Sequence, residues 1–108
     1  MWSFGAATPR AYLAASLAYH LRGGIAEKII CPVFVGCGES DQFFLGQPEE
    51  LMAHLTAPAT LASFTDAEGA GAHCQVGAQR LLSARMLDWL DETLSTPAQP
   101  AEASVEQR

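Results

Sequence analysis

The chain has 108 residues, of which 49% are hydrophobic and 17% are charged. This composition predicts one globular domain, because a disordered chain carries fewer apolar and more charged residues. The formal net charge is −6 and no basic run occurs, which argues against a nucleic-acid partner and against an anionic membrane surface.

Targeting and redox signals are also weak. No apolar stretch reaches the roughly 18 residues that a membrane span requires. The first twenty residues are apolar but lack a positively charged leading segment, so they do not resemble a signal peptide. Cys31, Cys37 and Cys74 form an odd set without CxxC spacing. We therefore expect free thiols and a cytoplasmic location.

The first predicted element is a helix that begins after Thr8. Thr8 is a suitable N-cap, and Pro9 suits the first helical position. A mostly apolar stretch follows up to Leu21, and the pair Gly23 and Gly24 ends it.

A buried strand is predicted next. The run from Ile29 to Val35 is rich in β-branched and aromatic residues and is bounded by glycines, which is typical of a strand covered on both faces. Pro32 is tolerated at the first residue of a strand, so we expect the strand to run from about Pro32 to Gly36. The letters "GESD", residues 38–41, then predict a tight turn.

Three further elements complete the pattern. Residues 47–55, "QPEELMAHL", predict a short helix with Pro48 in its first turn, and residues 59–65, "ATLASFT", predict a second strand. After a Gly/Ala-rich loop, the spacing of apolar residues predicts an amphipathic helix from Gln75 to Leu94. Phe64 and Trp89 are expected to pack this helix on the sheet. Residues 1–95 form the predicted folded segment, and the Pro/Ala/Glu/Gln-rich residues 96–108 form a predicted disordered tail.

The order helix, strand, helix, strand, helix predicts an α/β architecture with parallel strands and flanking crossover helices. Two parallel strands are too few for a stable sheet, so the element count predicts part of a larger sheet. An unpaired strand edge is a template for another strand. We therefore expect a homo-oligomer or a partner chain at this edge.

Two polar residues lie just beyond the predicted strand ends. Asp41 follows the first strand, and His73 follows the second strand and its loop. Parallel strands present their carboxyl ends at one edge of a sheet, where ligands bind in open α/β sheets. A carboxylate beside an imidazole forms part of a hydrolytic proton relay. Two simpler alternatives are an Asx turn closed by Asp41 and a solvated loop histidine at position 73.

Two sequence segments resemble the α/β-hydrolase family. "CPVFVGCGESDQFF" is similar to the family's acid-loop strand, with a Pro, an apolar run and Gly-x-x-Asp; "GAGAHCQ" followed by "RMLDWLDETL" is similar to its terminal histidine loop and last helix. The resemblance covers roughly Ile25 to Leu94. It implies a partial α/β-hydrolase fold of the esterase- and peptidase-like branch, with Asp41 as the triad acid and His73 as the general base. The implied substrate is a small molecule with an ester, amide or carbon–carbon bond to cleave, and no cofactor is implied.

The sequence departs from this family at the nucleophile. The family's Gly-x-Ser-x-Gly elbow precedes the acid in the chain, and it is absent here; Ser40 lies in the acid turn and has Gln42 where the elbow has Gly. We therefore expect a C-terminal hydrolase fragment that is inactive unless a nucleophile comes from elsewhere. The alternatives are a non-catalytic remnant that pairs its open sheet edge, and a small α/β domain unrelated to the family.

Cys74, beside His73, is expected to be small packing material and not a nucleophile, because it is the histidine's neighbour in sequence. Cys37, Cys74 and His73 match no zinc-binding spacing, so no metal is expected. His20 and His54 lie on predicted helices and are expected to be ordinary surface or partly packed residues.

Overall fold

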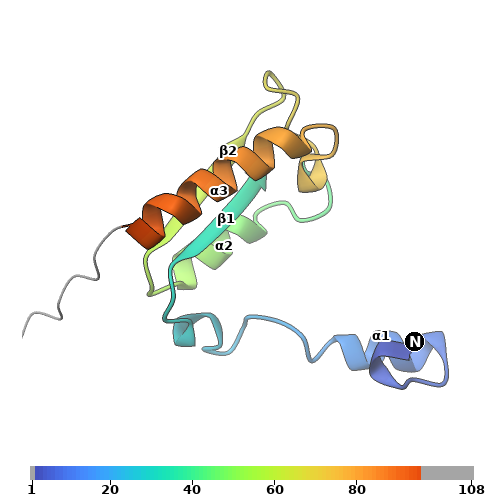
Figure 1. The fold of residues 1–108 in the computed structure, drawn as a ribbon. Coiled ribbons are helices and arrows are strands. Elements are labelled where there is room, and N and C mark those ends of the chain that lie inside the picture. The colour runs from blue at the N-terminus through green and yellow to red at the C-terminus, as the bar shows by residue number, and fades with distance from the viewer. Residues whose placement is uncertain (1, 96–108) are drawn as a thin grey trace, which may run out of the picture.

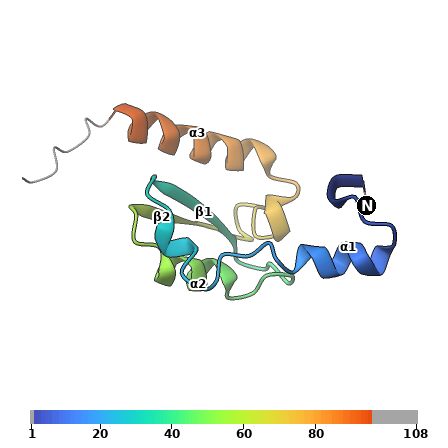
Figure 2. The ribbon, with the colours of Figure 1, turned by 90° about the horizontal axis from the view of Figure 1, so that it is seen from below.

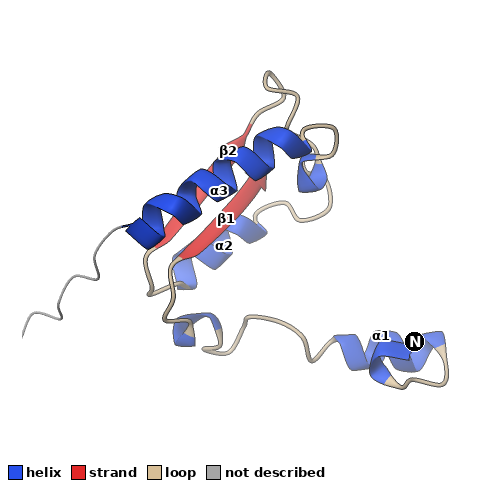
Figure 3. Ribbon diagram, viewed as in Figure 1, coloured by secondary structure: helices blue, strands red, loops and turns tan. Residues whose placement is uncertain are grey.

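The computed structural model describes residues 2–95 as a mixed α/β structure (Figure 1). Its elements are α1 (Pro9–Ser16), β1 (Val33–Gly38), α2 (Gln47–His54), β2 (Ala59–Phe64) and α3 (Gln79–Ser95), with short 3-10 turns at Trp2–Phe4, Ala26–Lys28 and His73–Gln75 (Figure 3). The predicted order of helices and strands is confirmed. The tail predicted at residues 96–108 lies outside the described residues.

The sheet has two parallel strands. Val33 of β1 lies opposite Ala59 of β2, and the pairing continues to Gly38 opposite Phe64. Helix α2 connects the strands on one face, and α3 covers the other face (Figure 2). Both strands therefore end at the same edge, as predicted. Strand β1 continues past the expected end at Gly36 to Gly38, because Glu39 N–H still bonds to the carbonyl of Phe64 (2.9 Å).

Aromatic side chains hold α3 against the sheet, as predicted. The Trp89 ring lies 5.5 Å from the Phe34 ring, and its Nε1–H donates to Thr60 Oγ1 at 3.2 Å. The Arg85 guanidinium lies 4.9 Å from the centre of the Phe64 ring. The helix begins at Gln79 and not at the expected Gln75, because residues 73–75 form a separate turn.

The first helix is shorter than expected. Its start is confirmed, since Thr8 Oγ1 accepts the N–H of Ala11 at 3.1 Å. It ends at Ser16, however, and does not continue to Leu21. Figure 1 shows that α1 lies away from the sheet, so the sheet offers no surface for its apolar residues. A short helix without tertiary packing is marginal in water, which explains the early end.

The buried core is small. Its apolar members are Ala26, Val35, Phe64 and Ala70. The Cα radius of gyration is 18.4 Å, whereas a compact domain of about this length has about 13 Å. Within residues 2–95, none of the helices combines the length and hydrophobicity needed to cross a bilayer.

Candidate functional site: a carboxylate–histidine pair at the sheet edge

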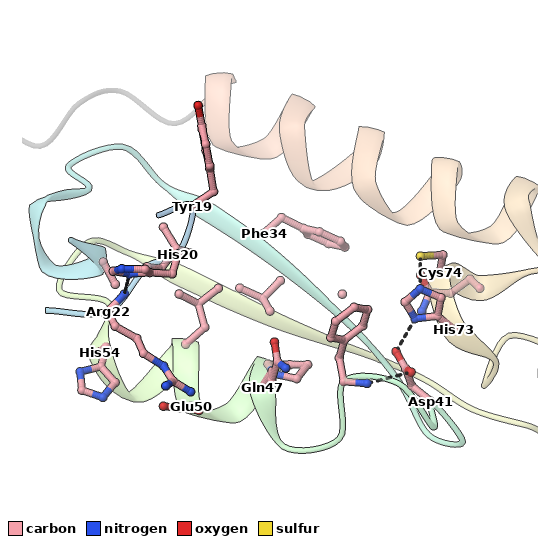
Figure 4. A pocket seen from close by; sticks show the side chains of 18 of the residues that line it. Tyr19, His20, Arg22, Phe34, Asp41, Gln47, Glu50, His54, His73 and Cys74 are labelled. Carbon is pink, nitrogen blue, oxygen red and sulfur yellow. Dashed lines mark hydrogen bonds and ion pairs between the residues drawn. The ribbon is translucent and has the colours of Figure 1, made fainter. Parts of the chain in front are cut away.

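Asp41 and His73 meet at the carboxyl edge of the sheet. His73 Nδ1 lies 2.9 Å from Asp41 Oδ2, and the two side chains are 34% and 18% exposed. The predicted meeting of these two side chains is confirmed (Figure 4). Their catalytic roles remain predictions.

The second oxygen of Asp41 fixes the loop that follows β1. Asp41 Oδ1 accepts the backbone N–H of Phe43 at 2.9 Å and that of Phe44 at 3.3 Å. The Asx turn that was the simpler alternative is thus present together with the histidine contact, and one carboxylate serves both. The hydrogen bond from His73, helped by the N–H of Phe43, lowers the pKa of the Asp41 carboxyl below its ordinary value.

The Asx turn also places two aromatic rings against the imidazole. The Phe43 and Phe44 rings lie 5.0 and 5.1 Å from the His73 ring, both in tilted arrangements. Such contacts restrict the ring's orientation. The same turn therefore supplies the carboxylate that bonds Nδ1 and the two rings that flank the histidine.

The loop that carries His73 crosses very close to the end of β1. A Cβ atom on Gly38 would lie 2.6 Å from the carbonyl oxygen of Gly71 and 2.8 Å from that of Ala72, distances that only glycine permits. Ser40 N–H then donates to the Gly71 carbonyl at 2.9 Å. Gly38 therefore lets the two loops approach closely enough for Asp41 and His73 to meet.

Acidic and hydroxyl side chains join the same two loops, and the sequence analysis missed them. Glu39 Oε2 accepts the N–H of Asp66 at 2.7 Å, and the Ser40 hydroxyl bonds to the Asp66 carboxylate. Ser40 is thus a structural residue in the acid turn. Its position one residue before Asp41 was the sequence signal that could have indicated this structural role.

The far nitrogen of His73 contacts Cys74. Cys74 Sγ lies 3.2 Å from His73 Nε2, and Cys74 is exposed. The expectation that Cys74 is packing material is therefore wrong. The reason is its backbone: Cys74 has a φ of 52°, a left-handed conformation that turns its side chain back to Nε2 of the preceding residue.

Gln79 at the start of α3 supports this turn, which sequence reasoning also missed. Its Nε2 donates to the carbonyl of Cys74 at 2.9 Å and to that of Gln75 at 3.3 Å. Gln75 itself is buried and also has a φ of 52°. The amide of Gln79 therefore ties the two left-handed residues to the helix that follows.

A cleft of about 1300 Å³ extends from the pair along β1 (Figure 4). Asp41, His73 and Cys74 lie at one end of it in Figure 4, and its lining also includes the apolar side chains of Phe44, Leu82 and Met86. Within residues 2–95, no three His, Cys, Asp or Glu side chains are grouped closely enough to hold a metal ion.

A second histidine–carboxylate pair lines the other end of the cleft. His54 Nδ1 lies 2.7 Å from Glu27 Oε1 and joins α2 to the Ala26–Lys28 turn. This contact lowers the pKa of Glu27. The pair lies at the amino end of the strands, and Figure 4 shows His54 far from His73 along the cleft.

The geometry of the first pair determines what its imidazole can do. An ionised carboxylate only accepts hydrogen bonds, so the Nδ1 of His73 must carry the proton that Asp41 Oδ2 receives. In the neutral ring, Nε2 is then the free acceptor. The pair is therefore arranged to take a proton from a group placed at Nε2 and to stabilise the resulting imidazolium.

Two curated proteins are similar to most of the chain. Hydrolase LUC6 from Fusarium sp. is 30% identical over 99 residues, which are 85% of this chain and 23% of the relative. The 20-hydroxy-prefusarin hydrolase FUS2 from Gibberella moniliformis is 30% identical over 101 residues, which are 87% of this chain and 24% of the relative. No protein-family profile matches the chain, and no solved structure matches it. The chain spans about a quarter of the length of these two relatives, and the similarity relates it to proteins named as hydrolases.

Proposed function

We propose that this chain is the part of a serine-type α/β hydrolase that supplies the acid and the general base. Asp41 orients His73, and His73 Nε2 takes the proton of a serine hydroxyl carried by a segment outside these residues. The observation that carries the proposal is the contact of 2.9 Å between His73 Nδ1 and Asp41 Oδ2. The similarity to two proteins named as hydrolases supports it.

The mechanism follows from the unprotonated Nε2 of His73, the nitrogen opposite the one that bonds Asp41. As the serine oxygen attacks the substrate carbonyl, its proton moves to Nε2, and the charge on the imidazolium is balanced by Asp41. The imidazolium then protonates the leaving group. Water, whose proton Nε2 accepts, next attacks the acyl-serine; the serine oxygen leaves, takes that proton back, and the free acid departs. The substrate is a small molecule with an ester, amide or activated carbon–carbon bond, bound in the cleft that Asp41 and His73 line. The reaction needs no cofactor.

A chimera tests this proposal. The region of Hydrolase LUC6 that matches this chain is replaced by the chain, and hydrolysis of p-nitrophenyl acetate is measured. General-base assistance contributes about 10²–10⁴-fold, so His73→Ala should lower turnover by at least about 100-fold. His54→Ala is the comparison variant, because it also removes a histidine paired with a carboxylate but at the other end of the cleft, and it should lower turnover far less than His73→Ala does.

Two results would contradict the proposal. One is a His73→Ala chimera that keeps more than about a tenth of the turnover, since a general base contributes more than that. The other is a folded chimera with the unchanged chain that hydrolyses no ester at all.

A second candidate function is that of a non-catalytic remnant that pairs its sheet edge with another chain. The observation that favours it is the apolar surface beside the sheet. In residues 2–95, each strand has one neighbour only, and Ile30, two residues before Pro32, is 92% exposed. Unpaired strands and exposed apolar side chains favour association.

A further inference from the structure

The Nε2 atom of His73 already has a nucleophilic group beside it. Cys74 Sγ lies 3.2 Å from this nitrogen, and the opposite nitrogen of the ring bonds to Asp41 at 2.9 Å. Thiol, imidazole and carboxylate therefore stand in one line of contacts, in the order nucleophile, base and orienting acid. All three groups belong to this chain, so the arrangement is complete without a serine from elsewhere.

The other two cysteines of the chain, Cys31 and Cys37, do not lie beside an imidazole as Cys74 does. Cys31 is exposed. Cys37 is half-buried, and its Sγ lies 3.6 Å from Glu49 Oε1. Burial, helped by the charge of Glu49, raises the pKa of the Cys37 thiol and disfavours its thiolate. Among the three thiols, Cys74 is the one that lies beside an imidazole, whereas the Cys37 thiol donates to a carboxylate.

The backbone holds the thiol in this position. Left-handed φ values are unfavourable for residues other than glycine, and both Cys74 and Gln75 adopt them. The turn is fixed from both sides, because Gln75 N–H bonds to the Ala72 carbonyl at 2.9 Å and Gln79 Nε2 bonds to the Cys74 carbonyl at the same distance. The sulfur is therefore held beside Nε2 of His73, in a residue that is exposed.

We propose that Cys74, His73 and Asp41 form a thiol relay within this chain that accepts an acyl group from a small activated ester. The acyl end of the ester lies against Phe44, which lines the same cleft and whose ring lies 5.1 Å from that of His73. The proposal goes beyond the serine mechanism, because it needs only the residues of this chain.

The reaction balances without an oxidant or a metal. The Sγ–H proton moves to His73 Nε2 while sulfur forms a bond to the carbonyl carbon. The carbon–oxygen bond of the ester then breaks, and the imidazolium returns its proton to the leaving alcohol, which leaves a thioester on Cys74. Water attacks this thioester while Nε2 accepts one of its protons. The sulfur leaves, takes that proton back, and the free carboxylic acid departs.

The test uses the purified chain and p-nitrophenyl acetate, without any further segment that could supply the nucleophilic serine. The expected result is a burst of p-nitrophenol of one equivalent per chain, and a single acetyl group that peptide mass spectrometry finds on Cys74. Within the same chain, Cys31 and Cys37 should acquire the acetyl group at least about tenfold more slowly. Labelling that is equal at the three cysteines, or faster at Cys31, would overturn the proposal.

Variants distinguish acetylation that depends on His73 from acetylation that depends only on the exposure of the Cys74 thiol. His73→Ala keeps the thiol and removes its base, so the rate of acetylation at Cys74 should fall by about 10²-fold. Cys74→Ala should abolish the burst, whereas Cys31→Ala should leave it unchanged. A burst that survives Cys74→Ala, or a Cys74 rate that is insensitive to His73→Ala, would contradict the relay. The internal comparison of the three thiols in the unaltered chain does not depend on any variant folding.

The outcome is independent of the serine mechanism. In the chimera, Cys74→Ala removes the thiol relay and keeps the serine, so ester turnover that persists in Cys74→Ala and is lost in His73→Ala reports on the serine. The acetyl group on Cys74 of the isolated chain reports on the thiol relay. Failure of one test therefore leaves the other unaffected.

Discussion

Asp41 shows how one side chain can serve structure and chemistry together. One carboxylate oxygen accepts two backbone N–H groups of the following turn, and the other accepts the proton on His73 Nδ1. The hydrogen bonds lower the pKa of Asp41, so the carboxylate is ionised at neutral pH. A residue held in this way cannot rotate away from the histidine without also losing the turn.

At the scale of single residues, the sequence predicted the contact between Asp41 and His73, because the direction of the two strands determines where these residues lie. Asp41 and His73 each follow a parallel strand, and the topology alone brings them to one edge. The contact between Cys74 and His73 was not predicted, because it depends on the left-handed φ of Cys74. Residues other than glycine adopt that conformation uncommonly, and no sequence pattern here indicates it.

At the scale of elements, the site depends on how closely the end of β1 approaches the loop before α3. Gly38 has no room for a Cβ atom, whereas the nearest atoms to a Cβ on Gly36 in the same strand would be 3.8 Å away. The two glycines therefore form a matched pair, of which only one lies at the crossing of the loops.

Replacement of Gly38 by alanine should lower the unfolding free energy, whereas the same replacement at Gly36 should leave it almost unchanged. Gly38→Ala forces the backbone at Gly71 and Ala72 to move, and overpacking of this kind costs about 1–3 kcal/mol of unfolding free energy. It should also weaken the contact between Asp41 and His73. Gly36→Ala should change the unfolding free energy by less than about 0.5 kcal/mol.

Urea denaturation of the chain and its two variants measures this difference. Equal stability of the Gly38→Ala and Gly36→Ala variants would contradict the close crossing of the two loops.

The elements themselves were predictable to different degrees. Strand β1 followed from a continuous apolar run, and α3 from an apolar stripe that packs Trp89 on the sheet. The length of α1 was not predictable, because a pattern of apolar residues specifies a long helix only when a surface is present to cover it. Leu13 and Leu17 are both exposed, so that surface is absent.

At the scale of the whole molecule, the chain leaves much apolar surface uncovered. Its buried core contains few large side chains, and the sheet has an open edge on each side within residues 2–95. The chain also spans about a quarter of the length of the two hydrolases that it resembles in sequence. An open parallel edge with apolar neighbours favours pairing with further chain.

We therefore expect the purified chain to associate with itself when no larger partner is present. Sedimentation velocity should show dimers or larger species whose fraction rises with protein concentration. Ile30→Lys should shift the distribution towards the monomer, since it places a charge on an exposed apolar position beside the edge. A folded chain that sediments as a monomer over the whole concentration range would contradict this expectation and the remnant function with it.

The account as a whole depends on Asp41 holding His73 with its proton on Nδ1, so that Nε2 is free to accept one. Nitrogen NMR of the histidine rings tests this most directly, at about pH 8, well above the ordinary histidine pKa of about 6.5. His20 is the internal control, because its Nδ1 accepts the N–H of Arg22 at 3.1 Å and its proton must therefore lie on Nε2. We predict the Nδ1–H form for His73, the Nε2–H form for His20, and loss of the Nδ1–H preference at His73 in Asp41→Asn. A proton on Nε2 of His73 in the unaltered chain would contradict both the serine and the thiol mechanisms.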